Sequence, residues 1–585
     1  MKRVVVFLLL TAAAAAAEVP PFAERVRMAI ELYAHPPGGR DGGYVTIAAR
    51  LYLHQESAWC SKRLIELLAG PPGGDMFWMY QVTAIAYLDG GQLSDEARRA
   101  LRRSFKTYMP YRGDTENHWV MYYSSLYLMA QLWPNEAGET WYTGKSSEEN
   151  LREAQGWIES WVKLTTTRGQ GEYDSPHYMA MFLIPISELA AWAKDPAMKK
   201  RARMILEYLV ADYAAENLDG LYVSAHSRVY ERALLEKAAS VAGDFGWLLF
   251  GVGHKPEPFI SAYAMYFVIA AQYEPPEVLR LIATDRSRPY THYERKRTRN
   301  RWRFYDELHG PVYKTTYVRR EYAVASDQGG VLQPIQQHSW GVTWAVPDPR
   351  GVQNTLFTMQ PYQGLRELQT YFTFPPDGPV ADIIRSKPTY DSPDKLLGGS
   401  PYEKIFQNED TVIALYNIPP HTRFPQINGF FSKDLADVRE DASGWIFARG
   451  GEALIAFRVF QPYLWKPIQG GSQRLFSPYL QNAVIVQVAP VTDFGGMDGF
   501  RTTILKLKLE ARAEPVPTVR FRSLRGRDLQ FTWGQTPSVD GKPLDYAAWP
   551  LFGGPFLEAA VDSETLVLKH GQLRRTLDFK NLTVQ

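Results

Sequence analysis

Two short polar segments hold the side-chain types that acid–base chemistry uses. The first, residues 114–119, places Asn117 and His118 beside Glu116. The second, residues 171–178, combines two carboxylates, two phenols and an imidazole: Glu172, Asp174, Tyr173, Tyr178 and His177. An imidazole or a phenol can transfer a proton, and an amide can hydrogen-bond a developing negative charge. Both segments are therefore candidate parts of one catalytic or binding site.

Helix capping offers a second interpretation of the same residues. Asp114 or Thr115 can cap a following helix, and the negative charge of Glu116 suits a helix N-terminus. In the second segment, Asp174 or Ser175 is an expected cap whatever the function. Capping does not explain Asn117 and His118, which are mediocre helix formers beside many aromatic residues.

Two further segments could form another wall of such a site. Residues 224–230 carry His226, Arg228 and Tyr230 in a predicted loop, where binding and catalytic residues concentrate. His338 and Trp340 come just before a predicted strand. The alternative for both segments is an ordinary solvated surface.

Alternating arginines mark the middle of the chain. Arg295, Arg297, Arg299, Arg301 and Arg303 would place five guanidinium groups on one face of an extended strand. Such a stripe can bind carboxylate or sulfate groups. It can equally be a strand edge that charge protects against pairing with another strand.

Helical periodicity dominates the chain before residue 285 and must position the polar segments. Met179, Phe182, Leu183, Ile186 and Ala190 form one apolar stripe, and Pro176 is the expected first helical residue. The predicted helices are Phe22–Ala34, Val45–Leu68, Phe77–Leu88, Ser94–Tyr108, Asn117–Leu132, Ser147–Leu164, Pro176–Ala193, Pro196–Ala215, Glu231–Val241 and Pro258–Tyr273. Many antiparallel helices with short loops predict an α/α toroid-like domain over residues 18–285.

Strand-like patterns replace the helical ones after the junction. Alternating or β-branched runs are separated by Gly, Pro, Asp and Asn, which favours an antiparallel sandwich. The predicted strands include Thr315–Val324, Gly341–Ala345, Thr411–Tyr416, Ala453–Val459, Ala483–Val488, Thr502–Leu507 and Thr565–Lys569. We therefore expect a multidomain α and β protein whose residues 286–585 form one large β-sandwich region or two sheet domains.

The first 17 residues have the pattern of a secretory signal peptide. Lys2 and Arg3 precede the apolar stretch Val4–Leu10, and an alanine run ends at Ala17. The apolar part is shorter than the roughly 20 residues of a membrane span, so no stable membrane insertion is expected. The predicted location is the periplasm or the exterior. Cys60 is the only cysteine, so no intrachain disulfide can form.

Several classes of chemistry lack support in the sequence. The formal net charge is +2, which argues against a nucleic-acid partner despite the arginine stripe. Nucleotide-binding glycine motifs and a nucleophile elbow are absent in a convincing context. No HExxH motif occurs, and the 11 histidines do not cluster at metal-ligand spacing. We expect neither a cofactor nor a catalytic metal.

With these segments in place, the chain resembles the toroid-plus-sandwich polysaccharide lyases, such as chondroitin, alginate and heparin lyases. The residues that carry the resemblance are Asn117, His118, the segment Tyr173–Tyr178, and His226, Arg228 and Tyr230. In such lyases an Asn, Gln or Arg neutralises a uronate carboxylate, a His or Tyr removes the C5 proton, and a Tyr protonates the leaving O4. The resemblance implies an anionic polysaccharide or oligosaccharide as substrate.

Roles follow from the resemblance for the individual residues. Asn117 and Arg228 would bind the carboxylate, and His118 or His226 would act as base or orient it. Tyr173, Tyr178 or Tyr230 would exchange protons. Further substrate contacts are expected from Glu116, Glu172, Asp174, His177, His338 and Trp340.

Two alternatives remain open at this stage. An inverting-type glycoside hydrolase on the same toroid would use two carboxylates, for which Glu116, Glu172 and Asp174 are the candidates. A non-catalytic glycan-binding protein would use the same aromatic and polar groups without chemistry.

Overall fold

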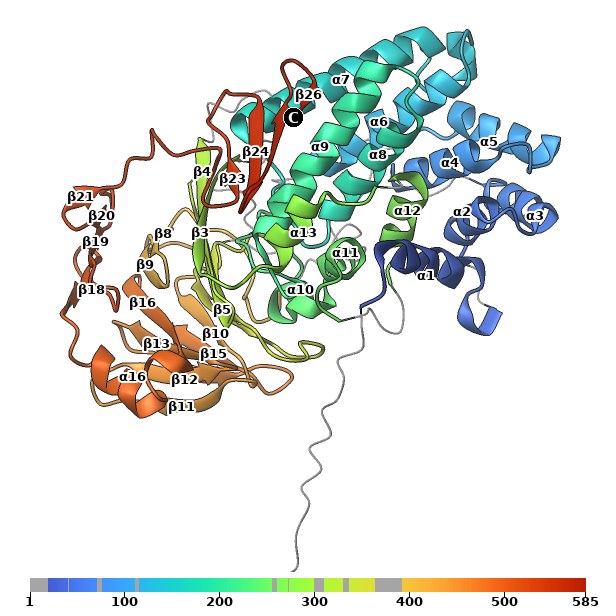
Figure 1. Ribbon diagram of the computed structural model, residues 1–585. Coiled ribbons are helices and arrows are strands. Elements are labelled where there is room, and N and C mark those ends of the chain that lie inside the picture. The colour runs from blue at the N-terminus through green and yellow to red at the C-terminus, as the bar shows by residue number, and fades with distance from the viewer. Residues whose placement is uncertain are drawn as a thin grey trace, which may run out of the picture.

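The structure, a computed structural model, describes most of the chain (Figure 1). Its described residues are 19–39, 42–70, 76–110, 115–254, 260–271, 273–298, 310–329, 336–362 and 392–585. The predicted signal peptide, Asp114, Arg299, Arg301 and Arg303 lie outside them. Among the described residues, no helix is long and apolar enough to cross a membrane.

Helices fill the first half of the described chain. They are α1 (Phe22–Ala34), α2 (Tyr44–Tyr52), α3 (Ser57–Leu67), α4 (Phe77–Leu88), α5 (Asp95–Thr107), α6 (Glu116–Leu132), α7 (Ser147–Arg168), α8 (Met179–Trp192), α9 (Pro196–Ala215), α10 (Glu231–Leu235), α11 (Val241–Phe250), α12 (Ala262–Ala271) and α13 (Glu277–Thr284). Helices α2, α4, α6 and α8 each contact the next, and α12 contacts both α8 and α2, which closes a ring. Helices α1, α7 and α9 pack against members of this ring, so the helical half is toroid-like.

Local sequence explains where the important helices begin. Thr115 caps α6, because its Oγ1 accepts a hydrogen bond from the His118 amide at 3.2 Å. Ser146 and Glu149 form a reciprocal capping box at the start of α7. Asp195 caps α9 and Pro196 follows as its first residue. The Thr115 cap thus fixes the start of α6, the helix that carries Asn117 and His118.

A nine-stranded antiparallel sheet begins the β half. Its order is β14 (Leu464–Pro467), β15 (Gln473–Ser477), β10 (Ile427–Phe431), β7 (Thr355–Met359), β6 (Trp340–Trp344), β5 (Tyr322–Gln328), β4 (Pro311–Val318), β3 (Tyr290–Arg297) and β22 (Phe552–Gly553). In the register of β3 and β4, Glu294 lies directly opposite Lys314. That pairing sets up the buried charges described below.

A second sheet of six strands packs against the first. Its order is β11 (Ala436–Glu440), β12 (Ile446–Gly450), β13 (Ala453–Val459), β16 (Gln481–Pro490), β9 (Thr411–Asn417) and β8 (Glu403–Asn408). Buried residues of both sheets, among them Trp344, Phe357, Val412 and Phe457, form one core. The two sheets therefore make an antiparallel sandwich.

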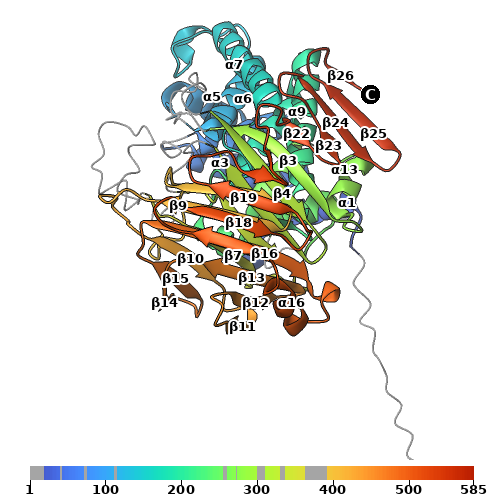
Figure 2. The same cartoon turned by 90° about the vertical axis from the view of Figure 1, so that its left-hand side faces the viewer.

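A third layer covers the outer face of the six-stranded sheet (Figure 2). It consists of helix α16 (Met497–Ile504) and a five-stranded sheet: β17 (Leu509–Arg512), β18 (Thr518–Arg522), β19 (Asp528–Thr532), β20 (Ser538–Val539) and β21 (Lys542–Pro543). Phe500, Phe521 and Phe531 share a core with Ile413 and Ile485 of the six-stranded sheet.

The end of the chain returns to the helical half (Figure 1). A four-stranded sheet contains β23 (Leu557–Glu558), β24 (Thr565–His570), β25 (Leu573–Asp578) and β26 (Thr583–Val584). Its apolar residues belong to the core of the helices, and His570 contacts Asp285 at 2.8 Å just after α13. Helices and sheets are thus joined through β3 and also through this sheet.

The predicted fold class, a helical toroid-like half followed by antiparallel β-structure, is confirmed. Some predicted elements are wrong in detail. Val45–Leu68 is two helices, because His54 and Glu56 adopt positive φ between them. Thr315–Val324 spans parts of two strands, β4 and β5, rather than one.

Two other element predictions also fail. Helix α8 begins at Met179 and not at Pro176, although Ser175 makes the cap contact that the sequence suggests, since its Oγ accepts from the Tyr178 amide at 3.1 Å. Thr502–Leu507 is the end of α16 and not a strand, because Phe500 and Ile504 pack as one helical face.

Candidate active site

The segment between α7 and α8, residues 169–178, is where the helical and β halves meet. Its consecutive side chains point to different neighbours. Glu172 contacts α6 and the loop 224–230, Tyr173 contacts β5, and Asp174 contacts β3 and β4. Residues 169–178 therefore contact α6 and the loop 224–230 through one side chain, and strands of the β half through the next two.

Glu172 links three of the predicted segments. One oxygen, Oε2, accepts hydrogen bonds from the Asn117 amide at 3.1 Å and from Asn117 Nδ2 at 2.5 Å. The other, Oε1, pairs with Arg228 Nη1 at 3.0 Å. Arg228 Nε donates to Gln336 Oε1 at 2.8 Å, which adds the loop before β6. All four residues are buried, so this network supports the site from within.

Beside this network lies an aromatic group, formed by Tyr178, Tyr230 and His177, that is partly exposed at the surface. The hydroxyl groups of Tyr178 and Tyr230 are hydrogen-bonded to each other, and the Arg228 guanidinium carbon lies 3.9 Å from the centre of the Tyr178 ring. The His177 ring packs edge-on against the Tyr178 ring at 5.0 Å and the Tyr230 ring at 5.2 Å. Tyr230 and His177 are partly exposed, whereas Tyr178 is buried. A phenol and an imidazole are therefore both partly open to solvent at this place.

Burial keeps the imidazole of His177 neutral. Burial and the positive charge of Arg228 lower the pKa of His177 to about 4. A neutral imidazole near neutral pH can accept a proton. His118, the other partly exposed histidine of the prediction, lies one residue from Asn117 and packs edge-on against Phe77 at 5.4 Å between ring centres.

Glu116 is part of the interior framework. Its carboxylate accepts hydrogen bonds from the indole of Trp161 at 2.9 Å and from the Gly171 amide at 2.9 Å, and it forms an ion pair with Arg297. Arg297 belongs to the predicted arginine stripe. It is buried and its Nε donates to the Gly169 carbonyl at 3.0 Å. Arg297, a described residue of the stripe, thus binds the carboxylate of Glu116 inside the protein.

The remaining predicted residues are buried on the β side. Tyr173 donates to Asp327 Oδ2 at 2.9 Å and is fully buried. His226 and His338 form an isolated antiparallel bridge through their backbones, and burial lowers the pKa of both imidazoles well below the usual value. Trp340 is also fully buried, in the core of the sandwich. Tyr173 and the His226–His338 bridge thus connect the two halves.

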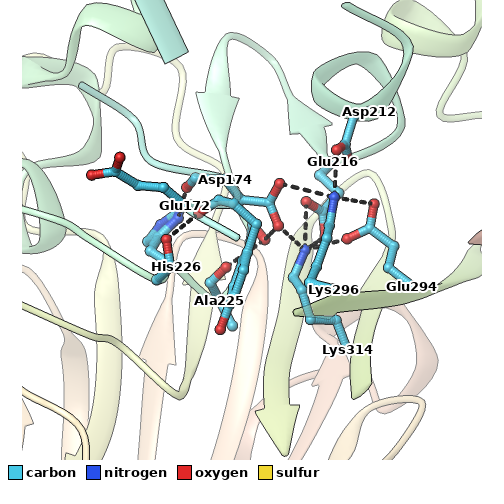
Figure 3. A network of polar contacts seen from close by, with 12 residues as sticks. Glu172, Asp174, Asp212, Glu216, Ala225, His226, Glu294, Lys296 and Lys314 are labelled. Carbon is cyan, nitrogen blue, oxygen red and sulfur yellow. Dashed lines mark hydrogen bonds and ion pairs between the residues drawn. The ribbon is translucent and has the colours of Figure 1, made fainter. Parts of the chain in front are cut away.

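Asp174 belongs to a buried charge cluster, formed by Asp174, Asp212, Glu216, Glu294, Lys296 and Lys314 (Figure 3). Lys314 forms ion pairs with Asp174, Glu216 and Glu294, and Lys296 contacts Asp212, Asp174 and Glu294. Figure 3 shows the Asp174 carboxylate turned toward both lysines. The cluster unites residues of α9 and the segment before α8 with residues of β3 and β4.

The carboxylates of the cluster have the spacing of a metal site. One oxygen from each of Asp174, Asp212, Glu216 and Glu294 lies within 4.8 Å of the others. The two ammonium groups contact these same carboxylates and supply the positive charge that a cation would bring. Four carboxylates still outnumber two ammonium groups, and burial raises the pKa of Glu216 to about 7. The negative charge of the four carboxylates is therefore balanced by the two lysines and by protonation, and not by a divalent cation.

The cluster was missed from the sequence although β3 carried a signal. Its even positions, His292, Glu294 and Lys296, share the face opposite Arg295 and are all buried. Charged residues at every second position can thus mark either face of a strand, and the sequence alone does not tell which face is buried. Asp212 lies near the end of α9 and Glu216 just after it, where the helix is buried on every side and its charged residues show no alternation.

Comparisons with known proteins add structural neighbours but no sequence relatives. The chain is similar to chondroitin AC lyase of Streptomyces coelicolor A3 in complex with chondroitin sulphate, with 12% identity and a TM-score of 0.46 over 96% of this chain and 89% of that one. It is also similar to xanthan lyase of Paenibacillus, with 8% identity and a TM-score of 0.39 over 95% and 64%. Both are polysaccharide lyases, the group that the sequence resembles. No protein-family model and no curated protein matches the sequence.

Proposed function

We propose that this chain is an exported polysaccharide lyase that cleaves an anionic, uronate-containing glycan by β-elimination. The observation that carries the proposal is the hydrogen-bonded pair of Tyr178 and Tyr230 lying on Arg228, beside a neutral His177. The pattern of residues 1–17 supports export, and the resemblance of the polar segments supports the substrate class.

The proposed reaction needs a base, an acid and positive charge. A base removes the C5 proton of the uronate, the bond from C4 to O4 breaks, a double bond forms between C4 and C5, and an acid returns a proton to O4. Tyr230 and His177 are partly exposed, so we assign the two proton transfers to them. Arg228 stabilises negative charge on the phenol pair from behind, since its guanidinium faces the Tyr178 ring.

Asn117 and Glu172 act in this proposal as positioning residues. Glu172 forms an ion pair with Arg228, and Asn117 Nδ2 donates a hydrogen bond to Glu172. Because Arg228 is 1% exposed and already paired, it acts through the phenols and not by direct contact with the substrate carboxylate. Tyr173 and His226 are fully buried, so we assign them no proton transfer.

The buried carboxylates argue against the hydrolase alternative. A glycoside hydrolase needs two carboxyl groups that reach the glycosidic bond. Glu116, Glu172 and Asp174 are each at most 9% exposed, and each carboxylate is engaged by an arginine or a lysine. None of the three predicted acids is therefore placed to flank a sugar.

The test is product analysis on purified protein. A panel of uronate-containing polymers is incubated with the chain, and products are followed by ultraviolet absorbance and mass. Elimination yields an unsaturated sugar with no added water, whereas hydrolysis adds one water per cleavage. Tyr230→Phe should abolish the unsaturated product, and Tyr479→Phe, at an exposed tyrosine of the β half, should not. Hydrolysis products, or glycan binding without any product, would overturn the proposal.

A further inference from the structure

A polar pocket of about 470 Å³ lies at the beginning of the helical half, between α1, α2 and α3. The side chains that matter are Trp59, His35, Arg50, Lys62, Arg63 and Glu66. Figure 1 shows α3 far from α10, the helix that follows Tyr230. The pocket is therefore separate from the candidate active site.

Its charges are unbalanced toward the positive side. Among the described residues, Arg50, Lys62 and Arg63 line the pocket together with one acid, Glu66. Arg63 Nη1 pairs with Glu66 at 3.0 Å, and Arg50 Nη1 pairs with Glu56 at 2.6 Å. Lys62 is exposed and makes no hydrogen bond or ion pair within the described part of the chain. The ammonium group of Lys62 is thus available to an anion.

Trp59 gives the pocket an aromatic wall of fixed orientation. The Arg50 guanidinium carbon lies 4.1 Å from the centre of the Trp59 ring, and Arg50 Nε donates to the Ala34 carbonyl at 3.0 Å. Arg50 is thus anchored on both α1 and the Glu56 carboxylate while it packs against the indole. Its partly exposed surface contributes to the lining.

We infer that this pocket binds an acidic saccharide, with the sugar ring against Trp59 and its carboxylate at Lys62. A tryptophan is amphipathic and presents a flat apolar face, which suits the C–H face of a sugar ring. The volume falls in the range of about 300–1,000 Å³ that small-molecule sites occupy. The site recognises a carboxylated sugar whether or not the chain performs elimination, so its failure and that of the proposed function are distinguishable.

Carbodiimide coupling localises the binding directly. The reagent joins a bound carboxylate to a neighbouring amine as an amide, taking up the water that is lost. The full chain is incubated with a short oligogalacturonate, and modified lysines are identified by peptide mass. We expect Lys62 to be labelled well above Lys200, an exposed lysine of α9, and the methyl ester of the same saccharide to label neither. Equal labelling of Lys62 and Lys200 would overturn the inference.

Affinity provides a second readout that does not depend on coupling. In calorimetric titrations with oligogalacturonate, Lys62→Met and Trp59→Ala should each raise the dissociation constant of one class of site. The expected increase is about tenfold, which corresponds to about 1.4 kcal/mol. Lys200→Met is the matched control and should change nothing. Neither pocket variant should alter the elimination rate on short substrates, because the Tyr230 site is elsewhere. Unchanged affinity in Lys62→Met, with the fold intact by circular dichroism, would contradict the assignment.

Discussion

Arg228 and Glu172 form an ion pair of 3.0 Å in which the side chains are 2% and 0% exposed. The pair joins the loop 224–230 to the segment before α8, and Asn117 of α6 hydrogen-bonds to the same carboxylate. Three parts of the chain that are distant in sequence are thus held by one buried charge. The Tyr178 ring packs against the guanidinium group of the same arginine.

Breaking this pair should destabilise the protein strongly. Arg228→Met leaves Glu172 as a buried carboxylate without its cation, at a cost of about 3–5 kcal/mol in the free energy of unfolding. The double variant Arg228→Met/Glu172→Gln should lose less than the sum of the single changes. Urea unfolding measures both. The matched control is Arg152→Met in the exposed Arg152–Glu148 pair, where about 0–1 kcal/mol is expected. Equal costs at the two pairs would show that Arg228 is not an interior anchor.

Removing one phenol should affect catalysis more than folding. If Tyr230 transfers a proton, Tyr230→Phe should lower the elimination rate by roughly 10²–10⁴-fold. Tyr178→Phe removes the hydrogen-bond partner of Tyr230 and should also slow the reaction, without exposing a cavity. Initial rates on the polymer that the wild type degrades best give the comparison, with Tyr479→Phe as control. A Tyr230→Phe variant of full activity would leave the phenol pair with a structural role only.

His177 should make the folded state sensitive to mild acid. Its pKa is about 4 in the fold against an ordinary value of 6.5, so between these values the unfolded chain binds a proton that the folded chain does not. Stability contributed by the neutral imidazole therefore falls as the pH drops from 6.5 toward 4. His177→Gln should flatten this part of the curve of unfolding free energy against pH. The same change at exposed His421 should leave the curve as it is in the wild type.

Glu216 should give the unfolding free energy the opposite dependence on pH. Burial and neighbouring carboxylates raise its pKa from 4.5 to about 7, so the folded chain holds a proton that the unfolded chain releases. Stability from this group is present below pH 4.5 and is lost as the pH rises through 7. We expect Glu216→Gln to reduce the loss of stability over this range, relative to Glu148→Gln at an exposed position. If both variants follow the wild-type curve, Glu216 is ionised in the fold.

Much of the helical half was predictable, because helix patterns are local. The ends of α1, α4 and α9 agree with the predicted ranges, since apolar spacing is read within a few turns, and Asp195 also caps α9. Helix α11 was missed because its apolar residues surround the axis and give little periodicity. The break between α2 and α3 was missed because non-glycine residues adopt the positive φ there.

The sequence by itself determined which residue types stand near helix N-termini, and so which segments could hold an imidazole, a phenol and a carboxylate. Only the tertiary structure decided the direction of each side chain. Within 171–178, Glu172 faces Arg228, Tyr173 faces Asp327 and Asp174 faces Lys314, partners that lie 56, 154 and 140 residues away. The physical reason is that burial and ion pairing depend on what packs against a segment, and that neighbour comes from a distant part of the chain.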